Sequence, residues 1–218
     1  MNLTRLIRRL AVGGTVAALV LTVAPAAASA SSGKTPRGVR SLAQVLTRDT
    51  SGFDRNGYDY DILTKAVLTV LKAKPQSPVK VLTNGGVALT AFTPNDRAFE
   101  RLAQDLTHAR RLPSEQQAFA TVAGVGLDTV ENILLYHVVP GATIDARTAL
   151  RSDGAALTTA LGPTITVDVE GAWFCRRIRL IDADRSDRDP RVVRFDINKG
   201  NKQIAHGIDR VLRPIDLP

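Results

Sequence analysis

Apolar residues recur at helical spacing in the first half of the chain. Residues 61–74 carry one apolar stripe and Pro75 follows it, so we predict a helix that ends before this proline. The stripe consists of Ile62, Leu63, Ala66, Val67, Val70 and Leu71. Between residues 79 and 93 the pattern favours two short strands on either side of an Asn84–Gly85 turn.

Capping residues predict three more helices. Asn95 can cap a helix that runs to Leu106, and Ser114 with Gln117 forms a capping box for a helix that ends near Ala123. The same capping-box signature precedes the segment TVENILLYH, where its two residues are Asp128 and Glu131.

The second half of the chain has the pattern of β-strands. From Ala155 onward, β-branched or alternating segments are separated by breaks rich in Gly, Pro and Asp. These segments are ALTTAL, TITVDV, AWFCRRIRLI, RVVRFDI and QIAHGIDRVL. Helices in the first half and strands in the second predict one α+β domain, which we place at residues 41–215.

The N-terminus has the order of an export signal. Residues 1–9 carry three arginines and no acidic residue, residues 10–23 are apolar or small, and residues 28–30 (Ala-Ser-Ala) suit signal peptidase. We predict a signal peptide at 1–30, a flexible spacer at 31–40, and a secreted or cell-wall-associated protein with no transmembrane segment in the mature chain. An uncleaved anchor is the alternative, because no charge lies between Arg9 and Lys34, but Pro25 and the small residues after it favour cleavage.

Composition excludes several classes of protein. One Cys and three His among 218 residues exclude a disulfide framework and a structural zinc site with four Cys or His ligands. The net charge is +8, of which Arg5, Arg8 and Arg9 contribute three within the predicted signal peptide. The remaining arginines are interspersed with aspartates along the chain, so we expect no nucleic-acid partner.

Three blocks of sequence resemble the fasciclin (FAS1) family. LTAFTPNDRAFERL (89–102) and DINKGNKQIAHGIDRVLRP (196–214) resemble its two signature blocks, and LLYHVVPGATI (134–144) resembles its Tyr-His segment. The resemblance spans most of residues 41–215 and implies a FAS1-like β-sandwich wedge with helices packed against it. The last block departs from the family pattern, with its turn moved back to Gly200–Asn201.

The resemblance also implies a function and a set of contact residues. Family members act mostly in adhesion, so we expect a non-enzymatic protein that binds an unidentified extracellular or cell-envelope protein or polysaccharide. The binding positions implied by the resemblance are Tyr136, His137, Asp196 and Ile197. His137, however, continues the apolar stripe of residues 130–134, and this spacing favours a buried histidine fixed by hydrogen bonds over a contact residue.

No pattern of catalytic or metal-binding residues stands out. The three His are far apart, and neither HExxH nor GxSxG occurs, so we expect no catalytic residues, no cofactor and no metal site. The Asp-rich segments 182–189 and 53–61 suggest calcium loops, but 182–189 lacks the Gly and Glu of an EF-hand and contains Arg185 and Arg188. We therefore favour solvated loops at both places, with a turn at Asn56–Gly57, and leave calcium binding by 182–189 open.

The alternative function is a carbohydrate-binding or small-ligand-binding module. Sugar binding usually needs exposed aromatic side chains, and the candidates are Tyr58, Tyr60 and Trp173 in a chain with only 5% aromatic residues. The single thiol, Cys175, falls on the polar face of its predicted strand, opposite Ile178 and Leu180. We expect slow maleimide labelling of this thiol and a minor disulfide-linked dimer.

Overall fold

The structure is a computed structural model that describes residues 38–172 and 175–215. The predicted signal peptide and residues 31–37 of the predicted spacer lie outside the described residues, as do Trp173 and Phe174. The elements in chain order are α1 (Leu42–Leu46), α2 (Asp61–Ala73), the 3-10 helix η1 (Pro78–Thr83), β1 (Leu89–Pro94), α3 (Asp96–Thr107), α4 (Glu115–Gly124), α5 (Leu127–Tyr136), β2 (Val138–Pro140), α6 (Ala146–Ala149), β3 (Ala156–Thr158), β4 (Thr164–Glu170), β5 (Arg177–Ile181), β6 (Val192–Ile197) and β7 (Gln203–Ile208).

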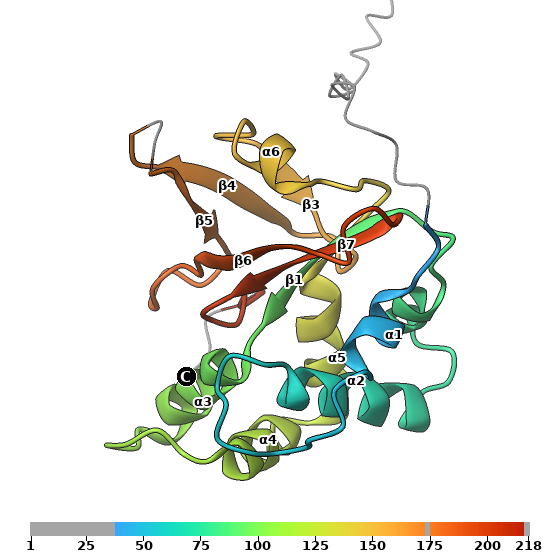
Figure 1. The fold of residues 1–218 in the computed structure, drawn as a ribbon. Helices are drawn as coiled ribbons and strands as arrows, with labels where there is room; N and C mark the ends of the chain where they lie inside the picture. The colour runs from blue at the N-terminus through green and yellow to red at the C-terminus, as the bar shows by residue number, and fades with distance from the viewer. Residues whose placement is uncertain (1–37, 173–174, 216–218) are drawn as a thin grey trace, which may run out of the picture. The chain divides into compact units, whose positions relative to one another are not determined.

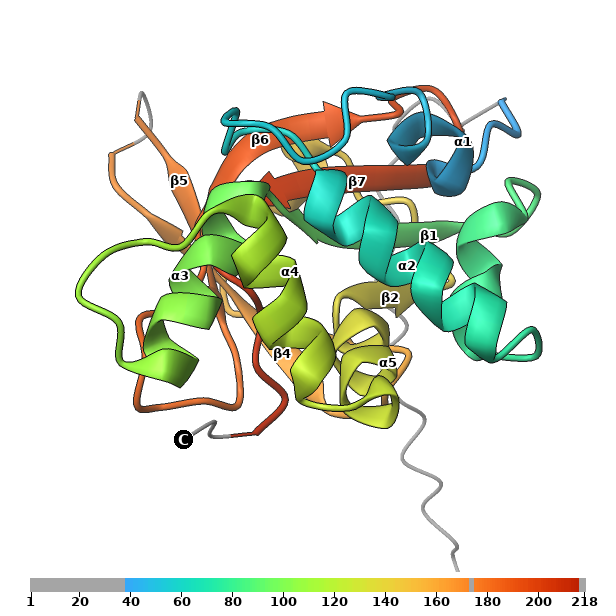
Figure 2. The same ribbon diagram turned by 90° about the horizontal axis from the view of Figure 1, so that it is seen from below.

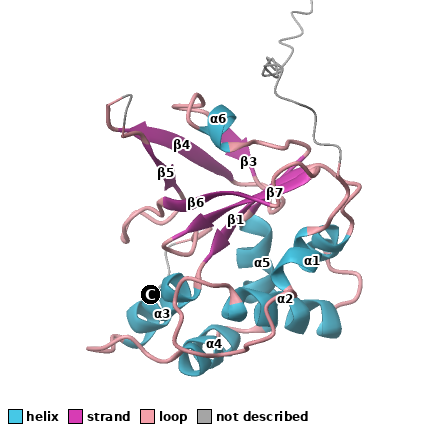
Figure 3. Cartoon of the chain, viewed as in Figure 1, coloured by secondary structure: helices cyan, strands magenta, loops and turns pink. Residues whose placement is uncertain are grey.

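The strands of the described residues form two sheets, with α1 to α5 gathered on one side (Figure 1, Figure 3). One sheet has the order β2-β1-β7-β6, in which β1 and β7 run parallel and the other pairs antiparallel. The other has the order β3-β4-β5 and is antiparallel throughout. The predicted α+β class and wedge with helices packed against it are confirmed, although the sheets do not make a clear β-sandwich.

The four-stranded sheet separates two apolar clusters. In β1, Leu89 and Ala91 point toward the helices, whereas Phe92 points toward the three-stranded sheet, as the two-residue period of a strand requires. The helix-side cluster contains the stripe of α2 together with buried residues of α3, α4 and α5. Figure 2 shows α2 in front of β1 and β7. Because β1 and β7 are covered on both sides, every residue in them is buried.

The second cluster fills the space between the two sheets. Ile165 and Val167 of β4, with Ile178 and Leu180 of β5, pack against residues that include Ile208 of β7. Burial of each of these side chains contributes about 1.5–3 kcal/mol. The last signature block is thus built into the interior, where β7 pairs with β1 on one side and β6 on the other.

Two of the predicted helix caps are present in the structure. The Asn95 side chain accepts a hydrogen bond from the Ala98 N–H at 2.9 Å and caps α3. Ser114 and Gln117 form the predicted capping box of α4, in which the Ser114 N–H donates to Gln117 Oε1 at 3.0 Å. Such a cap stabilises a helix by about 1 kcal/mol.

The capping box predicted for the next helix is wrong. Helix α5 starts at Leu127 after Gly126, which has φ of +99° and provides no side-chain cap. Asp128 and Glu131 instead accept hydrogen bonds from the ammonium group of Lys74, the residue that directly follows α2. Two acceptors that suit a cap are therefore used in an ion pair between helices.

The first of the two strands predicted within residues 79–93 is also wrong, because residues 78–83 form η1. The Gln203 amide nitrogen donates to the carbonyls of Val81 and Asn84 at 2.8 and 2.9 Å and so holds this turn in place. Position 85 requires glycine because the backbone of Val39 passes close to it. A Cβ there would lie 1.8 Å from the Val39 carbonyl oxygen.

The turn of the last hairpin lies at residues 198–200, slightly earlier than the predicted turn at Gly200–Asn201. Strand β6 ends at Ile197, and Asn198 and Gly200 take positive φ values of 66° and 85° in the turn. Asn201 pairs instead with Gly38, at the end of the predicted spacer, and the Gly38 N–H donates to the Gly200 carbonyl at 2.9 Å. Two register shifts in β6 accompany this turn.

Strand β5 is shorter than predicted and starts at Arg177. Ile178 and Leu180 are buried as expected, but Cys175 precedes the strand and is exposed. Cys175 is thus exposed to solvent, which agrees with its predicted place on the polar side, but it lies before β5 and not within that strand.

In the part of the chain that the structure describes, no single helix is long and apolar enough to cross a membrane. Helices α4 and α5 together have the length and apolar composition of a membrane span, but they are bent by 106° at the break between them.

Candidate functional site

Tyr136 is the last residue of α5 and is completely buried between the sheets. Its hydroxyl donates a hydrogen bond to the Thr164 carbonyl at 3.1 Å. Burial, together with the charge of Asp182, raises the pKa of Tyr136 to about 12. The side chain therefore joins α5 to β4 and is neutral at physiological pH.

His137 is buried, as its place on the apolar stripe predicted. The Leu212 N–H donates to its Nε2 at 2.9 Å, so the ring proton is on Nδ1 and is donated to the Ile133 carbonyl at 2.7 Å. Burial lowers the pKa of His137 to about 4, which keeps the ring neutral. Both ring nitrogens are satisfied by backbone groups, and the ring ties the end of α5 to the segment after β7.

Asp196 and Ile197 lie at the end of β6, where Asp196 has a positive φ of 59°. The Asp196 carboxylate accepts hydrogen bonds from the Ala146 N–H at 2.7 Å and from Lys199 Nζ at 2.6 Å. Its N–H donates to His206 Nδ1 at 3.3 Å. Ile197 is half-buried and packs against the helix-side cluster.

The structure does not join the two pairs of predicted contact residues. Among the described residues, no hydrogen bond or ion pair connects Tyr136 or His137 with Asp196 or Ile197. The first pair packs at the end of α5 and the second shapes the β6–β7 hairpin. As partner-binding positions all four stay predictions.

The Asp-rich loop 182–189 is neutralised by arginines that follow β7. Arg213 is buried and its guanidinium lies 3.2 Å from Asp184 and 3.1 Å from Asp187. One guanidinium nitrogen of Arg210, Nη1, donates to both oxygens of the Asp187 carboxylate, at 2.9 and 3.0 Å. The loop itself contains Arg185 and Arg188, and Arg210 and Arg213 add neutralising charge from a segment that is distant in sequence.

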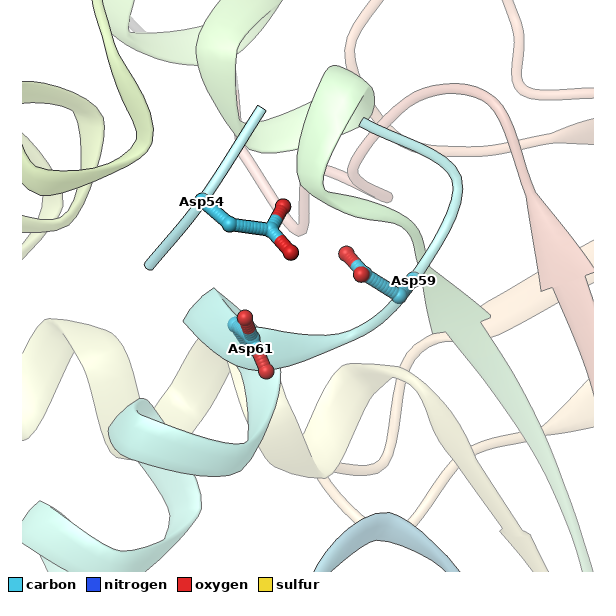
Figure 4. A group of neighbouring side chains, drawn as sticks. All are labelled: Asp54, Asp59 and Asp61. Carbon is cyan, nitrogen blue, oxygen red and sulfur yellow. The ribbon is translucent and has the colours of Figure 1, made fainter. Parts of the chain in front are cut away.

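A second acidic group lies where the loop 53–60 meets α2. Carboxylate oxygens of Asp54, Asp59 and Asp61 lie within 4.8 Å of one another, and Figure 4 shows the three side chains directed toward a common space. Oxygens of Asp59, Asp96 and Glu115 form an overlapping group with the same limit. We call these five carboxylates the acidic cluster.

Backbone hydrogen bonds hold the acidic cluster in place. Asp96 accepts from the N–H groups of Asp61 and Ile62 at 3.0 and 2.8 Å and so caps the start of α2 from the first turn of α3. Glu115, in the first turn of α4, accepts from the Asp54 N–H at 2.6 Å. The cluster therefore joins the loop to the N-terminal ends of three helices, which favour negative charge.

Crowding and burial hinder ionisation of the acidic cluster. Burial, together with the charges of neighbouring carboxylates, raises the pKa of Asp61 and of Glu115 to about 6 each. Burial, and a hydrogen bond with Asp59, raise the pKa of Asp96 to about 8. The ion pairs of residues 38–172 and 175–215 include none at these five carboxylates.

Sequence reasoning missed part of this cluster. The sequence singles out residues 53–61 as an acidic segment, but it does not place Asp96 or Glu115 beside them. Asp96 and Glu115 come close to the loop only because α3 and α4 pack against it, so no local sequence pattern indicates that they belong to the cluster.

A comparison with family models decides what kind of domain this is. The Fasciclin domain model matches residues 63–214, which is well over half of the chain. This chain belongs to the fasciclin family. A comparison with curated protein sequences found no match.

The fold of this fasciclin domain is also found among solved structures. It is similar to a FAS1 domain pair from the insect cell adhesion molecule Fasciclin I, with a TM-score of 0.53 and 17% sequence identity. The match covers 79% of this chain and 50% of that chain, so the fasciclin protein spans about half the length of the domain pair. At this identity the comparison shows the fold alone.

Two apolar pockets in the described part of this fasciclin domain are small. One lies between the sheets beside Phe92 and His206, with a volume of about 10 Å³, and the other lies beside Leu42 and His137, with about 20 Å³. Each has room for about one water molecule. Neither suits a small organic ligand, which needs several hundred Å³.

The histidines of this fasciclin domain are placed for structure rather than for acid–base chemistry. His206, like His137, is buried, and burial lowers its pKa. Its Nε2 donates to the Ile144 carbonyl at 2.8 Å. His108 is exposed at the end of α3, in the left-handed conformation that ends the helix.

Proposed function

We propose that this protein acts outside the cytoplasm as a non-enzymatic fasciclin domain that binds a protein of the cell envelope or extracellular space. The observation that carries the proposal is the family match over residues 63–214. Fasciclin domains occur in extracellular or cell-surface proteins and are generally non-enzymatic, and the similar FAS1 pair belongs to a cell adhesion molecule. The apolar stretch after the basic N-terminus supports export.

The described side chains support contact through a surface rather than a pocket. The pockets at Phe92 and Leu42 are of water size, and the buried histidines are held by backbone groups. We propose that Asp196 and Ile197 lie at the contact, since the hairpin that carries them is at the surface. Tyr136 and His137 then act indirectly, by holding α5 against β4 and the C-terminal segment.

A binding experiment with treated envelopes tests this proposal. The exported protein, labelled with biotin-maleimide at Cys175, is incubated with envelopes of the producing cells that are untreated, protease-treated or periodate-oxidised. We expect retention on untreated and oxidised envelopes and loss after protease treatment. Absence of retention on untreated envelopes would contradict the proposed function.

Two variants test where the partner binds. Asp196→Asn keeps an oxygen that accepts from the Ala146 N–H but removes the charge, and it should weaken retention several-fold. Asp153→Asn is the matched control. Asp153 also accepts a hydrogen bond from a backbone N–H, that of Val169 in β4, and it lies outside the β6–β7 hairpin. Equal retention by both variants would remove Asp196 from the contact.

The alternative, carbohydrate binding, has one structural observation in its favour. Tyr58 is 75% exposed, and an exposed ring can stack on a sugar. In that case periodate, and not protease, would abolish retention, and Tyr58→Ala would reduce it.

A further inference from the structure

Within the described residues, no arginine or lysine forms an ion pair with the acidic cluster, in contrast to the other acidic loop of this protein. Around residues 182–189 the carboxylates of Asp184 and Asp187 are matched by the guanidinium groups of Arg210 and Arg213. Around residues 54–61 the charges that act most on Asp61 are those of Asp59, Asp49 and Asp54, all of the same sign. The nearby guanidinium of Arg97 pairs with Glu100 at 2.9 Å.

Three buried oxygen atoms of this cluster have no hydrogen-bond partner among the described residues. They are Asp59 Oδ1, Asp61 Oδ2 and Glu115 Oε1. Asp61 is 7% exposed and Glu115 is 1% exposed, so water has little access to either carboxylate. A buried carboxylate without a partner is costly, because its charge loses the solvation of water and gains nothing in return.

The spacing of these oxygens suits one cation. Ca²⁺ binds oxygen ligands at about 2.3–2.6 Å, so two ligands of one ion lie no more than about 5 Å apart. Oxygens of Asp54, Asp59 and Asp61 all lie within 4.8 Å of one another. Asp54 is exposed, which leaves a path for the ion and for water ligands.

We propose that Asp54, Asp59 and Asp61 bind one Ca²⁺ ion. The Glu115 carboxylate supports the site from α4 by holding the Asp54 N–H and by adding negative charge beside Asp59. A set of oxygen ligands alone suits a hard cation and not Zn²⁺, which prefers nitrogen and sulfur. An irregular loop can supply the flexible geometry of Ca²⁺ more readily than the strict octahedron of Mg²⁺.

Bound calcium would fix the loop against the helical layer. Asp54 and Asp59 belong to the loop, whereas Asp61 belongs to the first turn of α2. An ion among them removes the repulsion between like charges and replaces it with attraction. This inference does not depend on the proposed adhesive function, because it concerns the stability and affinity of the isolated chain.

Calorimetric titration and thermal unfolding of the exported protein test the site. The protein is freed of metal with a chelator and titrated with CaCl₂, and separately with MgCl₂, in buffer with constant NaCl. We expect one Ca²⁺ per chain with Kd on the order of 10⁻⁴ to 10⁻³ M, in the range of extracellular calcium modules. At 10 mM CaCl₂ the unfolding midpoint should rise by roughly 3–10 °C.

Charge-removing variants locate the ion. Asp61→Asn and Asp54→Asn should each weaken calcium binding at least tenfold, and metal-free Asp61→Asn should be at least as stable as the natural protein, since it loses a buried like charge. The matched control is Asp187→Asn in the arginine-neutralised loop, whose Kd for calcium should change less than twofold. If Asp61→Asn does not fold, the result for Asp54→Asn, whose side chain is exposed, decides.

Three results would overturn the proposal. The first is no calcium-dependent heat or midpoint shift beyond that of added NaCl. The second is equal affinity for Mg²⁺. The third is a loss of calcium binding in Asp187→Asn equal to that in Asp54→Asn, which would place the ion elsewhere.

Discussion

Arg213 and Asp184 are both buried, and a guanidinium nitrogen of one lies 3.2 Å from a carboxylate oxygen of the other. The same guanidinium reaches Asp105 of α3 at 2.6 Å and Asp187 at 3.1 Å. One side chain from the segment after β7 therefore connects a helix to the β5–β6 loop. Because the pair is removed from water, its loss affects stability more than loss of a surface ion pair does.

Arg213→Met should reduce the free energy of unfolding by about 3–5 kcal/mol, because it leaves Asp184 buried without its cation. Chemical denaturation at pH 7 measures the loss. The double variant Arg213→Met with Asp184→Asn should recover part of it, since the uncompensated charge is then absent. A single-variant loss below about 1 kcal/mol would show that Ser186, which also bonds Asp184, satisfies it alone.

Features encoded within a few residues could be predicted from the sequence. The caps at Asn95 and at Ser114 with Gln117 lie next to the helices that they start, and both are present. The strands of the second half follow from their alternation, and Ile178 and Leu180 are buried as expected. The α+β class followed from the same local patterns.

Features that depend on distant partners could not be predicted. Residues 78–83 form a 3-10 helix whose end is held by Gln203, about 120 residues later, which donates to the carbonyls of Val81 and Asn84. Asp128 bonds Lys74 instead of capping α5. The acidic cluster needs Glu115 to reach a loop 61 residues earlier, and no local pattern reports that distance.

Cys175 should react rapidly with maleimide in the native protein. It is exposed and lies before β5, so no strand partner covers it. Labelling followed by mass spectrometry should show nearly equal rates in native and urea-unfolded protein, and aerobic storage should yield a disulfide-linked dimer. Cys175→Ser should stay monomeric on a non-reducing gel. Protection of the native thiol would contradict the placement of this residue.

The exported protein should begin at or near Ser31. Cleavage after the small residues 28–30 removes the basic and apolar segments, as in other secretory signal peptides. N-terminal sequencing of protein from the culture medium or cell wall checks this. Recovery of membrane-bound protein that retains residues 1–30 would show instead that the segment is an anchor.

His137→Ala should lower the free energy of unfolding by about 1–3 kcal/mol at pH 7. The substitution leaves the Leu212 N–H and the Ile133 carbonyl without their ring partners in a buried place. Partner binding by the folded variant should be retained. Unchanged stability together with lost binding would make His137 a contact residue.

The same histidine should also set part of the acid sensitivity of the protein. Its pKa is lowered to about 4 in the folded chain by burial, from an ordinary value near 6.5, so the folded state binds fewer protons than the unfolded state between these values. The resulting stability is complete above about pH 6.5 and is lost as the pH falls toward 4, on the order of 3 kcal/mol in total.

Chemical denaturation of the natural protein and of His137→Gln across this pH range tests the prediction. The difference between their free energies of unfolding should shrink as the pH falls. The control is His108→Gln, the same substitution at an exposed histidine. A constant difference between the natural protein and His137→Gln from pH 7 to 4 would mean that His137 stabilises the fold by packing alone.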